Sequence, residues 1–289
     1  MQQILITGGN GQLGHSLRRI LENDPEIEAI FTDVDNLDIT DRHAVGQFIS
    51  NNNISVIVNC AAYTAVDKAE SDKLLAAKIN TEAVGIIAEC AARHNVKVIH
   101  VSTDYVFSGE SYRPYMENDE PYPHTIYGRT KLEGEGLLTA FCADAVIIRT
   151  AWLYSEYGGN FVKTMLRLAD EGKTIKVVTD QIGTPTYAGD LAEAIRHILH
   201  FPTWHPGIYH FTNEGVASWY DFAKAIFRVA GKNNTKVIPV STREYPTPAK
   251  RPIYSVLNKQ KIKQTYSLEI PYWVDSLEKC LSTVQDIEF

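Results

Sequence analysis

A tyrosine and a lysine stand one helical turn apart in the segment YGRTKLEGE, residues 127–135. Residues at this spacing share one face of a helix, so we expect Tyr127 and Lys131 to be neighbours. A carbonyl carbon that receives a hydride becomes an alkoxide and needs a proton, which a phenol can donate. Because the pKa of a free tyrosine is about 10, a nearby ammonium would have to stabilise the phenolate, by roughly 4 kcal/mol for a shift to neutral pH. The pair therefore indicates reduction of a carbonyl group, with the charged face of an ordinary amphipathic helix as the alternative.

A second polar group follows the apolar run KVIHVS, residues 97–102. Ser102, Thr103 and Asp104 come at the end of this predicted strand, where a parallel sheet presents its ligand-binding groups. The Thr103 hydroxyl would donate a hydrogen bond to the oxygen that Tyr127 protonates and stabilise the charge that develops there. The sequence therefore predicts a catalytic set of Thr103, Tyr127 and Lys131.

Glycines stand at Gly8, Gly11 and Gly14, directly after the apolar run QILIT, and Gly9 completes a second match to a dinucleotide-binding spacing. Such a turn lets the backbone approach a pyrophosphate closely, and the following helix points its N-terminus at the phosphates. The residues after the turn have the periodicity of an amphipathic helix, which is the context this motif requires. The pattern predicts a dinucleotide site; a glycine-rich turn without a ligand is the alternative.

Acidic residues follow the second predicted strand. Asp33 is placed to accept hydrogen bonds from the adenosine ribose, with a plain loop carboxylate as the alternative. The segment DVDNLDITD superficially resembles a calcium loop, but Asp38 stands where that loop needs glycine and Ala44 where it needs glutamate. His197 and His200 have no third ligand placed nearby. We therefore predict no metal site.

Short apolar runs rich in β-forming residues alternate with longer amphipathic segments. The predicted strands cover residues 3–7, 28–32, 55–59, 97–102 and 145–150. The predicted helices between them cover residues 13–22, 41–51, 71–94 and 126–142. Such crossovers produce a parallel sheet with helices on both faces. The prediction is an α/β fold, a Rossmann-like doubly wound parallel sheet.

After about residue 150 the alternation gives way to turn-rich segments between predicted helices at 160–171, 188–200 and 218–230. Material of this kind packs over the carboxyl ends of the strands and shapes a substrate site. No long linker separates the two parts, so they should share one cleft. We expect a dinucleotide-binding domain over residues 1–150 and a mainly substrate-binding region over 151–289, interleaved with the end of the Rossmann sheet.

The composition restricts the partners. The chain has 289 residues, 44% of them hydrophobic, and a net charge of -7 without a basic run, so nucleic acid is not an expected partner. Four widely separated cysteines, the absence of a signal-peptide pattern and the absence of a long apolar run indicate a cytoplasmic protein that does not enter a membrane. The oligomeric state is left open, with a homodimer as one option.

Together these features resemble the extended short-chain dehydrogenases and, most closely, the dTDP-4-dehydrorhamnose reductase family. The resemblance is carried by GGNGQLG, LDITD, VNCAAYTAVDKAE, VSTDYVFSG, YGRTKLEGE, RTAWLY, NFVKTMLRLA, DQIGTPT, WYDFA and YPTPAKRP, which span nearly the whole chain. It implies reduction of the 4-keto group of dTDP-4-dehydro-L-rhamnose to dTDP-L-rhamnose, by hydride transfer from NADPH or NADH, with Tyr127 as the proton donor.

The resemblance also implies roles for individual residues. On the cofactor side these are Gly8, Gly11, Gln12, Leu13 and Gly14 at the turn, Asp33, Asp38 and Ile39 at the adenosine, Ala61, Ala62 and Tyr63 after the third strand, and Tyr127 and Lys131. On the substrate side they are Thr103 and Asp104 at the sugar, Trp152 as a platform, and Arg251 at the diphosphate. A simple core role is the alternative for Trp152.

Other functions remain open. A nucleotide-sugar dehydratase would need an acidic residue after Asp104, where Tyr105 stands, so dehydration is disfavoured. A related reductase, or an epimerase that recycles its cofactor internally, would share the Tyr/Lys pair. A non-catalytic regulator resembling the β subunit of methionine adenosyltransferase is not excluded by that pair, although Trp152 and DQIGTPT fit the reductases better. Asp33 favours NADH because a 2′-phosphate would face its carboxylate, whereas the resemblance favours NADPH.

Overall fold

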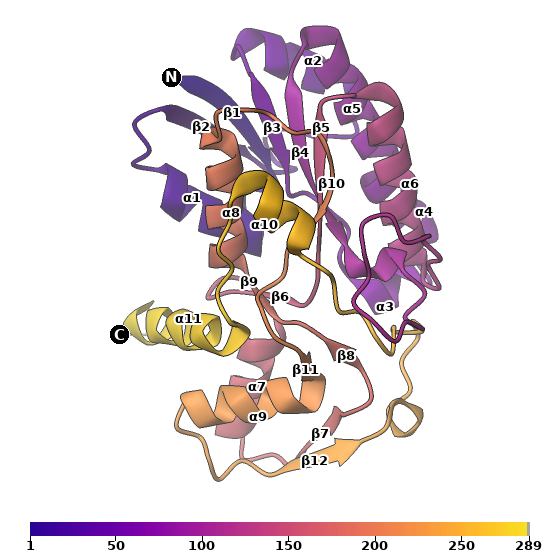
Figure 1. Ribbon diagram of the computed structural model, residues 1–289, viewed down its shortest axis with the longest axis vertical. Helices are drawn as coiled ribbons and strands as arrows, with labels where there is room; N and C mark the ends of the chain where they lie inside the picture. The colour runs from indigo at the N-terminus through magenta and orange to yellow at the C-terminus, as the bar shows by residue number, and fades with distance from the viewer. Residues whose placement is uncertain (288–289) are drawn as a thin grey trace.

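The computed structural model describes residues 1–287. At its centre is a parallel sheet of six strands in the order β10-β5-β4-β3-β1-β2 (Figure 1). The strands are β1 (Gln2–Thr7), β2 (Ile27–Thr32), β3 (Val56–Asn59), β4 (Lys97–Thr103), β5 (Ala145–Thr150) and β10 (Gly207–His210). The strand order reverses between β1 and β3, and ligands bind at such a switch point, outside the carboxyl ends of the strands. The predicted doubly wound parallel sheet is confirmed.

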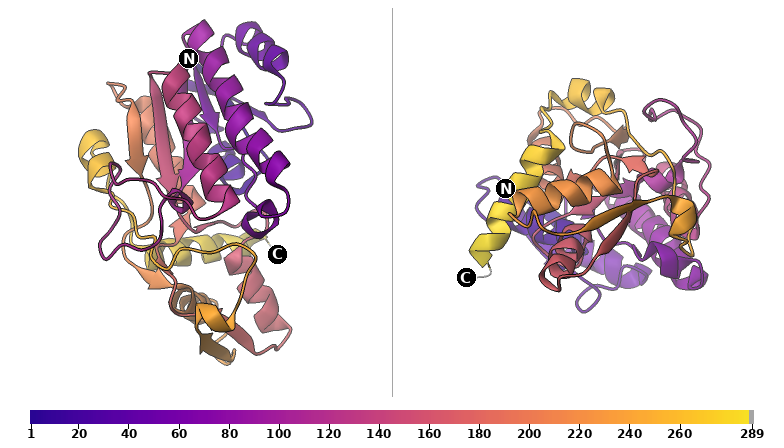
Figure 2. Two further views of the ribbon diagram at one scale, coloured as in Figure 1. Left: turned by 90° about the vertical axis from the view of Figure 1, so that its right-hand side faces the viewer. Right: turned by 90° about the horizontal axis from the view of Figure 1, so that it is seen from below.

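Helices cover both faces of this sheet (Figures 1 and 2). One face is covered by α1 (Gln12–Leu21), α8 (Ala188–His200) and α10 (Gln260–Tyr266), and the other by α2 (Arg42–Asn51), α5 (Ala83–His94) and α6 (Ile126–Phe141). Leu13, Leu17 and Leu21 recur at helical spacing on α1 and pack against the sheet. Because both faces are buried, the central strands are almost continuously apolar until their last residues, where polar side chains appear.

The helix predicted over residues 71–94 is interrupted in the structure. It consists of α4 (Lys73–Ala77), a π-helical turn η1 (Lys78–Glu82) and α5. The side chain of Asn80 is buried in this turn and bonds both the backbone N–H and the backbone carbonyl of Tyr63, at 2.9 and 3.1 Å. A π-helical turn inserts one residue into a helix and is often found at functional sites. Here it places Lys78 and Ile79 on the wall of a cavity.

The rest of the chain forms a second part below the sheet in Figure 1. There α7 (Phe161–Asp170), α9 (Trp219–Val229) and α11 (Trp273–Ile287) share an apolar core with the parallel pair β7 (Ile175–Val178) and β12 (Val237–Val240). The smaller elements are α3 (Val66–Ala69), the pair β6 (Leu153–Tyr154) with β9 (Thr186–Tyr187), the pair β8 (Ile182–Gly183) with β11 (Ala217–Ser218), and the 3-10 turns at Asp104–Val106 and Thr242–Glu244.

The division near residue 150 is not a clean boundary, because the chain enters the second part there and later returns to the large sheet. The structure contains the helices predicted at 160–171, 188–200 and 218–230. Of these, α8 packs against the large sheet, and the unpredicted strand β10 is an edge strand of that sheet. The functional division of the chain at this point stays a prediction. Among the described residues, no helix is both long and apolar enough to cross a membrane.

Candidate active site

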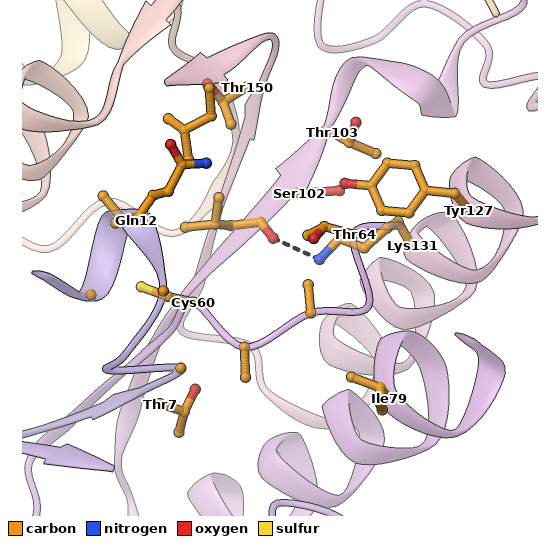
Figure 3. A pocket seen from close by; sticks show the side chains of 18 of the residues that line it. Thr7, Gln12, Cys60, Thr64, Ile79, Ser102, Thr103, Tyr127, Lys131 and Thr150 are labelled. Carbon is orange, nitrogen blue, oxygen red and sulfur yellow. Dashed lines mark hydrogen bonds between the residues drawn. The ribbon is translucent and has the colours of Figure 1, made fainter. Parts of the chain in front are cut away.

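A cavity of about 940 Å³ lies at the carboxyl ends of β1, β3, β4 and β5, with its far wall contributed by the second part of the chain (Figure 3). The predicted site residues that line it are Gly8, Gly11, Gln12, Leu13, Gly14, Asp33, Asp38, Ile39, Ala61, Ala62, Thr103, Asp104, Tyr127, Lys131, Trp152 and Arg251. Of the residues expected at the site, only Tyr63 does not line it. One cavity therefore brings together residues from opposite ends of the chain, such as Gly8 and Arg251.

The glycine turn has the shape that a pyrophosphate requires. Gly8 has φ of +67°, and a Cβ there would lie 2.7 Å from the backbone nitrogen of Ala61. A Cβ at Gly14 would lie 2.4 Å from the carbonyl oxygen of Gly8, so the turn and the helix can pack only with glycine at both positions. Gly11 precedes α1 and offers no side-chain cap, which leaves the first N–H groups of the helix free for an anion. These residues fit a dinucleotide.

The adenosine side is built from backbone-anchored carboxylates. Asp33 accepts hydrogen bonds from the backbone N–H groups of Asn10 and Val34, at 3.0 and 2.9 Å. Asp38 accepts from the hydroxyl and the backbone N–H of Thr40, and these bonds hold its pKa below the usual value. Asp33 is thus fixed beside the glycine turn before any ligand binds.

The side chain of Gln12 connects the turn to the second part of the chain. Its amide oxygen accepts hydrogen bonds from the Ser155 hydroxyl at 3.1 Å and the Asn160 amide at 3.0 Å. Gly158, Gly159 and Asn160 in the same loop line the cavity. Gln12 therefore joins the two walls of the site.

Tyr63 does not face the cavity, unlike Ala61 and Ala62 before it. Its hydroxyl donates to Asp72 at 3.1 Å, and its ring packs among buried alanines of the helical layer. The strand ends at Asn59, so the alternation that would have predicted the direction of this side chain no longer applies. Tyr63 shares an apolar cluster with Ile79 and Tyr127, which line the cavity, and its role at the cofactor stays a prediction.

Tyr127 lies in the first turn of α6, which Thr125 caps by accepting from the backbone N–H of Gly128 at 3.0 Å. Figure 3 shows its ring beside Ser102 and Thr103, at the end of β4. Burial raises the pKa of Tyr127, and a hydrogen bond with Thr103 opposes this effect. At neutral pH the phenol therefore carries the proton that a donor must supply.

Lys131 lies one turn after Tyr127 on α6 and lines the cavity, as expected, but its ammonium contacts β4. Its side chain is only 1% exposed, and its ammonium lies 2.7 Å from the carbonyl oxygen of Val101 and 3.2 Å from Nε2 of His100. Burial lowers the pKa of Lys131 to about 8, with Glu135 acting in the opposite direction. The expected lowering of the phenol pKa by a close ammonium is not found, because Lys131 contacts β4 and not the Tyr127 hydroxyl.

The substrate side contains a buried carboxyl group. Asp104 is 2% exposed; one of its oxygens accepts from the Thr103 hydroxyl at 3.1 Å, and its Oδ2 has no protein partner. Burial raises its pKa to about 6, against hydrogen bonds from Ser255 and Thr103. A buried polar atom is normally bonded, so Oδ2 is available to a hydroxyl group of a ligand.

Arg251 and Trp152 complete this side. The Arg251 guanidinium pairs with Asp67 at 2.7 Å and donates to the Tyr105 hydroxyl at 3.2 Å, so it is held at the cavity wall. Trp152 has φ of +49°, which is unusual for a bulky residue, and its ring stacks on Trp219 with centroids 3.7 Å apart. Such local strain persists where surrounding structure enforces it, frequently at ligand sites.

For the sugar nucleotide that the family resemblance implies as substrate, Trp152→Ala is expected to lower kcat/KM by about 10-fold and to leave the Kd of the cofactor unchanged. Steady-state kinetics and cofactor fluorescence titration measure the two effects separately. Trp204→Ala is the matched control, because Trp204 lies outside the cavity and donates to the carbonyl of Asp144. A Trp152→Ala variant with normal kinetics, but destabilised by about 3 to 5 kcal/mol, would show that the ring is only a core residue.

Several lining residues were not predicted from the sequence. They are Tyr105, Cys60, Lys78, Asn160 and Trp219, among others, whereas Ser102 was expected at the end of its strand. Trp219 belongs to the segment WYDFA that carries the family resemblance, so that segment could have pointed to it. The others lie on the π-helical turn, on a 3-10 turn and in short loops, whose paths local patterns do not define.

Comparison with known proteins agrees with this geometry. The profile of a family described as RmlD substrate binding domain matches residues 1–286. A dTDP-4-dehydrorhamnose reductase of Aggregatibacter actinomycetemcomitans is 45% identical over 287 residues, which cover 96% of this chain and 98% of the relative. The crystal structure of such a reductase from Clostridium acetobutylicum is similar with a TM-score of 0.94 and 43% identity, covering 98% of this chain and 100% of that one. A reductase of Bacillus anthracis, solved in complex with NADP, gives a TM-score of 0.93 and 40% identity, covering 98% and 99%. The chain therefore belongs to the dTDP-4-dehydrorhamnose reductase family.

Proposed function

We propose that this protein reduces the 4-keto group of dTDP-4-dehydro-L-rhamnose to give dTDP-L-rhamnose, with NADPH or NADH as the reductant. The observation that carries the proposal is that one cavity is lined by the glycine turn, by Thr103 and Tyr127, and by Trp152 and Arg251. Membership of the reductase family supports the same substrate and reaction.

Each residue would have a defined part in the reaction. When bound, NAD(P)H supplies the hydride. Tyr127 donates its proton to the oxygen of the former carbonyl, and the Thr103 hydroxyl hydrogen-bonds to that oxygen as negative charge develops. Lys131 supplies positive charge beneath the site and a donor to the cofactor ribose. Asp104 accepts from a sugar hydroxyl, Trp152 packs against the sugar ring, and Arg251 pairs with the diphosphate.

The direct test is to mix the purified protein with dTDP-4-dehydrorhamnose and either NADPH or NADH, and to follow the absorbance of the reduced cofactor. Oxidation of stoichiometric cofactor supports a reductase and opposes an epimerase, which regenerates its cofactor. A panel of other dTDP-4-keto sugars decides whether a related nucleotide sugar is preferred. No oxidation with either cofactor would refute the proposal, and copurification with a larger synthetase would then favour the regulatory alternative.

The cofactor preference is predicted to depend on Asp33. NADH should be used at least as readily as NADPH, because a 2′-phosphate would face the Asp33 carboxylate. Arg42, which could have neutralised such a phosphate, is paired with Glu89 instead, whereas Arg18 lies over the Phe31 ring.

Asp33→Ala should therefore raise kcat/KM for NADPH relative to NADH by about 10-fold, as expected for removal of about 1.4 kcal/mol of repulsion. Asp35→Ala is the control, since Asp35 is in the same loop but does not line the cavity. A strong NADPH preference that persists in Asp33→Ala would show that this carboxylate does not govern the choice.

The proposal also covers the location and the assembly of the protein. A nucleotide sugar and a dinucleotide are small dissolved substrates, which supports a cytoplasmic location and requires neither a membrane nor a nucleic acid partner. A homodimer is the proposed assembly, and sedimentation at several protein concentrations tests it.

A further inference from the structure

A row of buried polar side chains crosses the sheet beneath the cavity. Thr7 on β1, Asn59 on β3 and His100 on β4 are paired directly in register, so their side chains lie next to one another on one face of the sheet. Each is at most 1% exposed. The Thr7 hydroxyl lies 2.6 Å from the Asn59 amide, which in turn lies 3.0 Å from Nδ1 of His100.

This row ends on the catalytic lysine. Nε2 of His100 is 3.2 Å from the Lys131 ammonium, and the Val101 carbonyl oxygen is 2.7 Å from it. An ammonium carries three N–H donors, so these two acceptors occupy two of them. The third is left for the cavity, which Lys131 lines.

We propose that His100 is a positioning residue of this active site: as a neutral imidazole it accepts a hydrogen bond from Lys131 and so directs the remaining N–H of the ammonium to the cofactor side. The inference rests on the proposed function, because it assigns the target of that N–H. Neither the sequence motifs nor the similarity to known reductases identifies His100.

The other titratable groups around Lys131 do not provide this contact. Glu135, one turn further along α6, is bound by Arg149 through two hydrogen bonds of 3.0 and 2.7 Å. Burial raises the pKa of Cys60 to about 12, so it is an uncharged thiol. Tyr127, one turn earlier on α6, is likewise uncharged because burial raises its pKa. His100 is therefore the side chain that holds the ammonium.

His100 is suited to this role because burial and the Lys131 charge hold its pKa well below the usual value. In the structure the Asn59 amide has Nδ2 towards Nδ1 of His100, and its Oδ1 accepts from Thr7. A neutral ring that accepts at Nε2 carries its hydrogen on Nδ1, so the proposal requires the Asn59 amide to be turned, with its oxygen accepting from Nδ1. The Asn59 NH₂ group then faces Thr7, whose own hydrogen is free for the cavity. The amide orientation of the structure, with Nδ2 towards the ring, fits a hydrogen on Nε2 and an uncharged Lys131 amine. The row thus has one consistent hydrogen-bond pattern for each protonation state of Lys131.

The tautomer of His100 tests the inference without substrate or cofactor. In ¹⁵N-labelled protein, long-range ¹H–¹⁵N correlation spectra distinguish the two ring nitrogens, and His100→Gln identifies the signals by their loss. At about pH 6.5, below the pKa of Lys131, we expect a hydrogen on Nδ1 and none on Nε2, with exchange of the two as the pH passes about 8. An imidazolium, or a hydrogen on Nε2 at the lower pH, would overturn the proposal. This result is independent of which sugar the protein reduces.

Variants test the consequence for activity and for cofactor affinity. His100→Leu removes the acceptor and therefore disfavours the charged form of Lys131. The alkaline limb of the pH profile of kcat/KM should move to lower pH by about one unit, and the Kd of NAD(P)H should rise by about 10-fold. His100→Gln retains an amide oxygen that can accept from Lys131, and it should restore both. Val98→Ala, on the same face of β4 two residues earlier, is the packing control. A His100→Leu protein that is less stable, but has the alkaline limb and the cofactor affinity of the wild type, would show that His100 is only structural. If that variant does not fold, the tautomer measurement still decides.

Discussion

Tyr127→Phe is expected to lower kcat by about 100-fold to 10,000-fold, which is the usual contribution of a general acid, while cofactor binding stays within about twofold of the wild type. The substitution removes the hydroxyl and keeps the ring, so the first turn of α6 and its Thr125 cap remain intact. Burial raises the pKa of this phenol, so Tyr127 of the wild type is fully protonated at neutral pH. The ratio of the two kcat values should therefore not depend on pH below about 9.

The measurement is single-turnover kinetics with saturating reduced cofactor, alongside fluorescence titration of the same cofactor. Tyr63→Phe is the matched control, since it removes a tyrosine hydroxyl that bonds Asp72 outside the cavity. Turnover of Tyr127→Phe within about threefold of the wild type would rule out the role of proton donor.

Lys131→Met is expected to be more damaging than Tyr127→Phe, because it affects two properties of the site at once. The change removes the positive charge beneath the reacting carbonyl and also the donor assigned to the cofactor ribose. We therefore expect a larger fall in kcat/KM and a Kd for NAD(P)H raised by about 10-fold, equivalent to about 1.4 kcal/mol and typical of one hydrogen bond to a charged group.

Thermal unfolding measures the stability of Lys131→Met, which we expect to change little although activity is lost. A buried ammonium whose pKa is lowered by desolvation is a cost to the folded state at neutral pH, so methionine should not destabilise the protein greatly. Lys73→Met, on the exposed surface of α4, controls for loss of charge. If Lys131→Met binds the cofactor as tightly as the wild type, the ribose contact is refuted even when turnover is lost.

The sequence contained enough information for the main architecture. Buried parallel strands are short apolar runs between turn residues, and their predicted positions at 3–7 and 145–150 agree with β1 and β5. The strand β10 was missed because GIYH is only four residues long and follows a proline-rich turn. The helix at 71–94 was predicted as continuous because the signal for a π-helical turn is a tertiary contact, here between Asn80 and Tyr63.

The site could be predicted where a motif specifies backbone geometry or where the types and spacing of side chains indicate a reaction. The glycines at positions 8 and 14 are required by close approaches of the backbone, which local sequence records. His100 gave no such signal, since within KVIHVS it has the appearance of one more residue of a buried strand. Its importance depends on the register of three strands, which brings Thr7 and Asn59 beside it and which no single segment contains.

The bond between Gln12 and the loop containing Ser155 and Asn160 has a consequence for the order and strength of ligand binding. The turn proposed to receive the dinucleotide and the wall proposed to face the sugar share one amide oxygen as a common acceptor. A ligand that shifts Gln12 therefore also changes the position of the opposite wall, so the two binding equilibria are thermodynamically linked. Linkage is reciprocal: whatever factor the dinucleotide contributes to the affinity for the nucleotide sugar, the nucleotide sugar must contribute to the affinity for the dinucleotide.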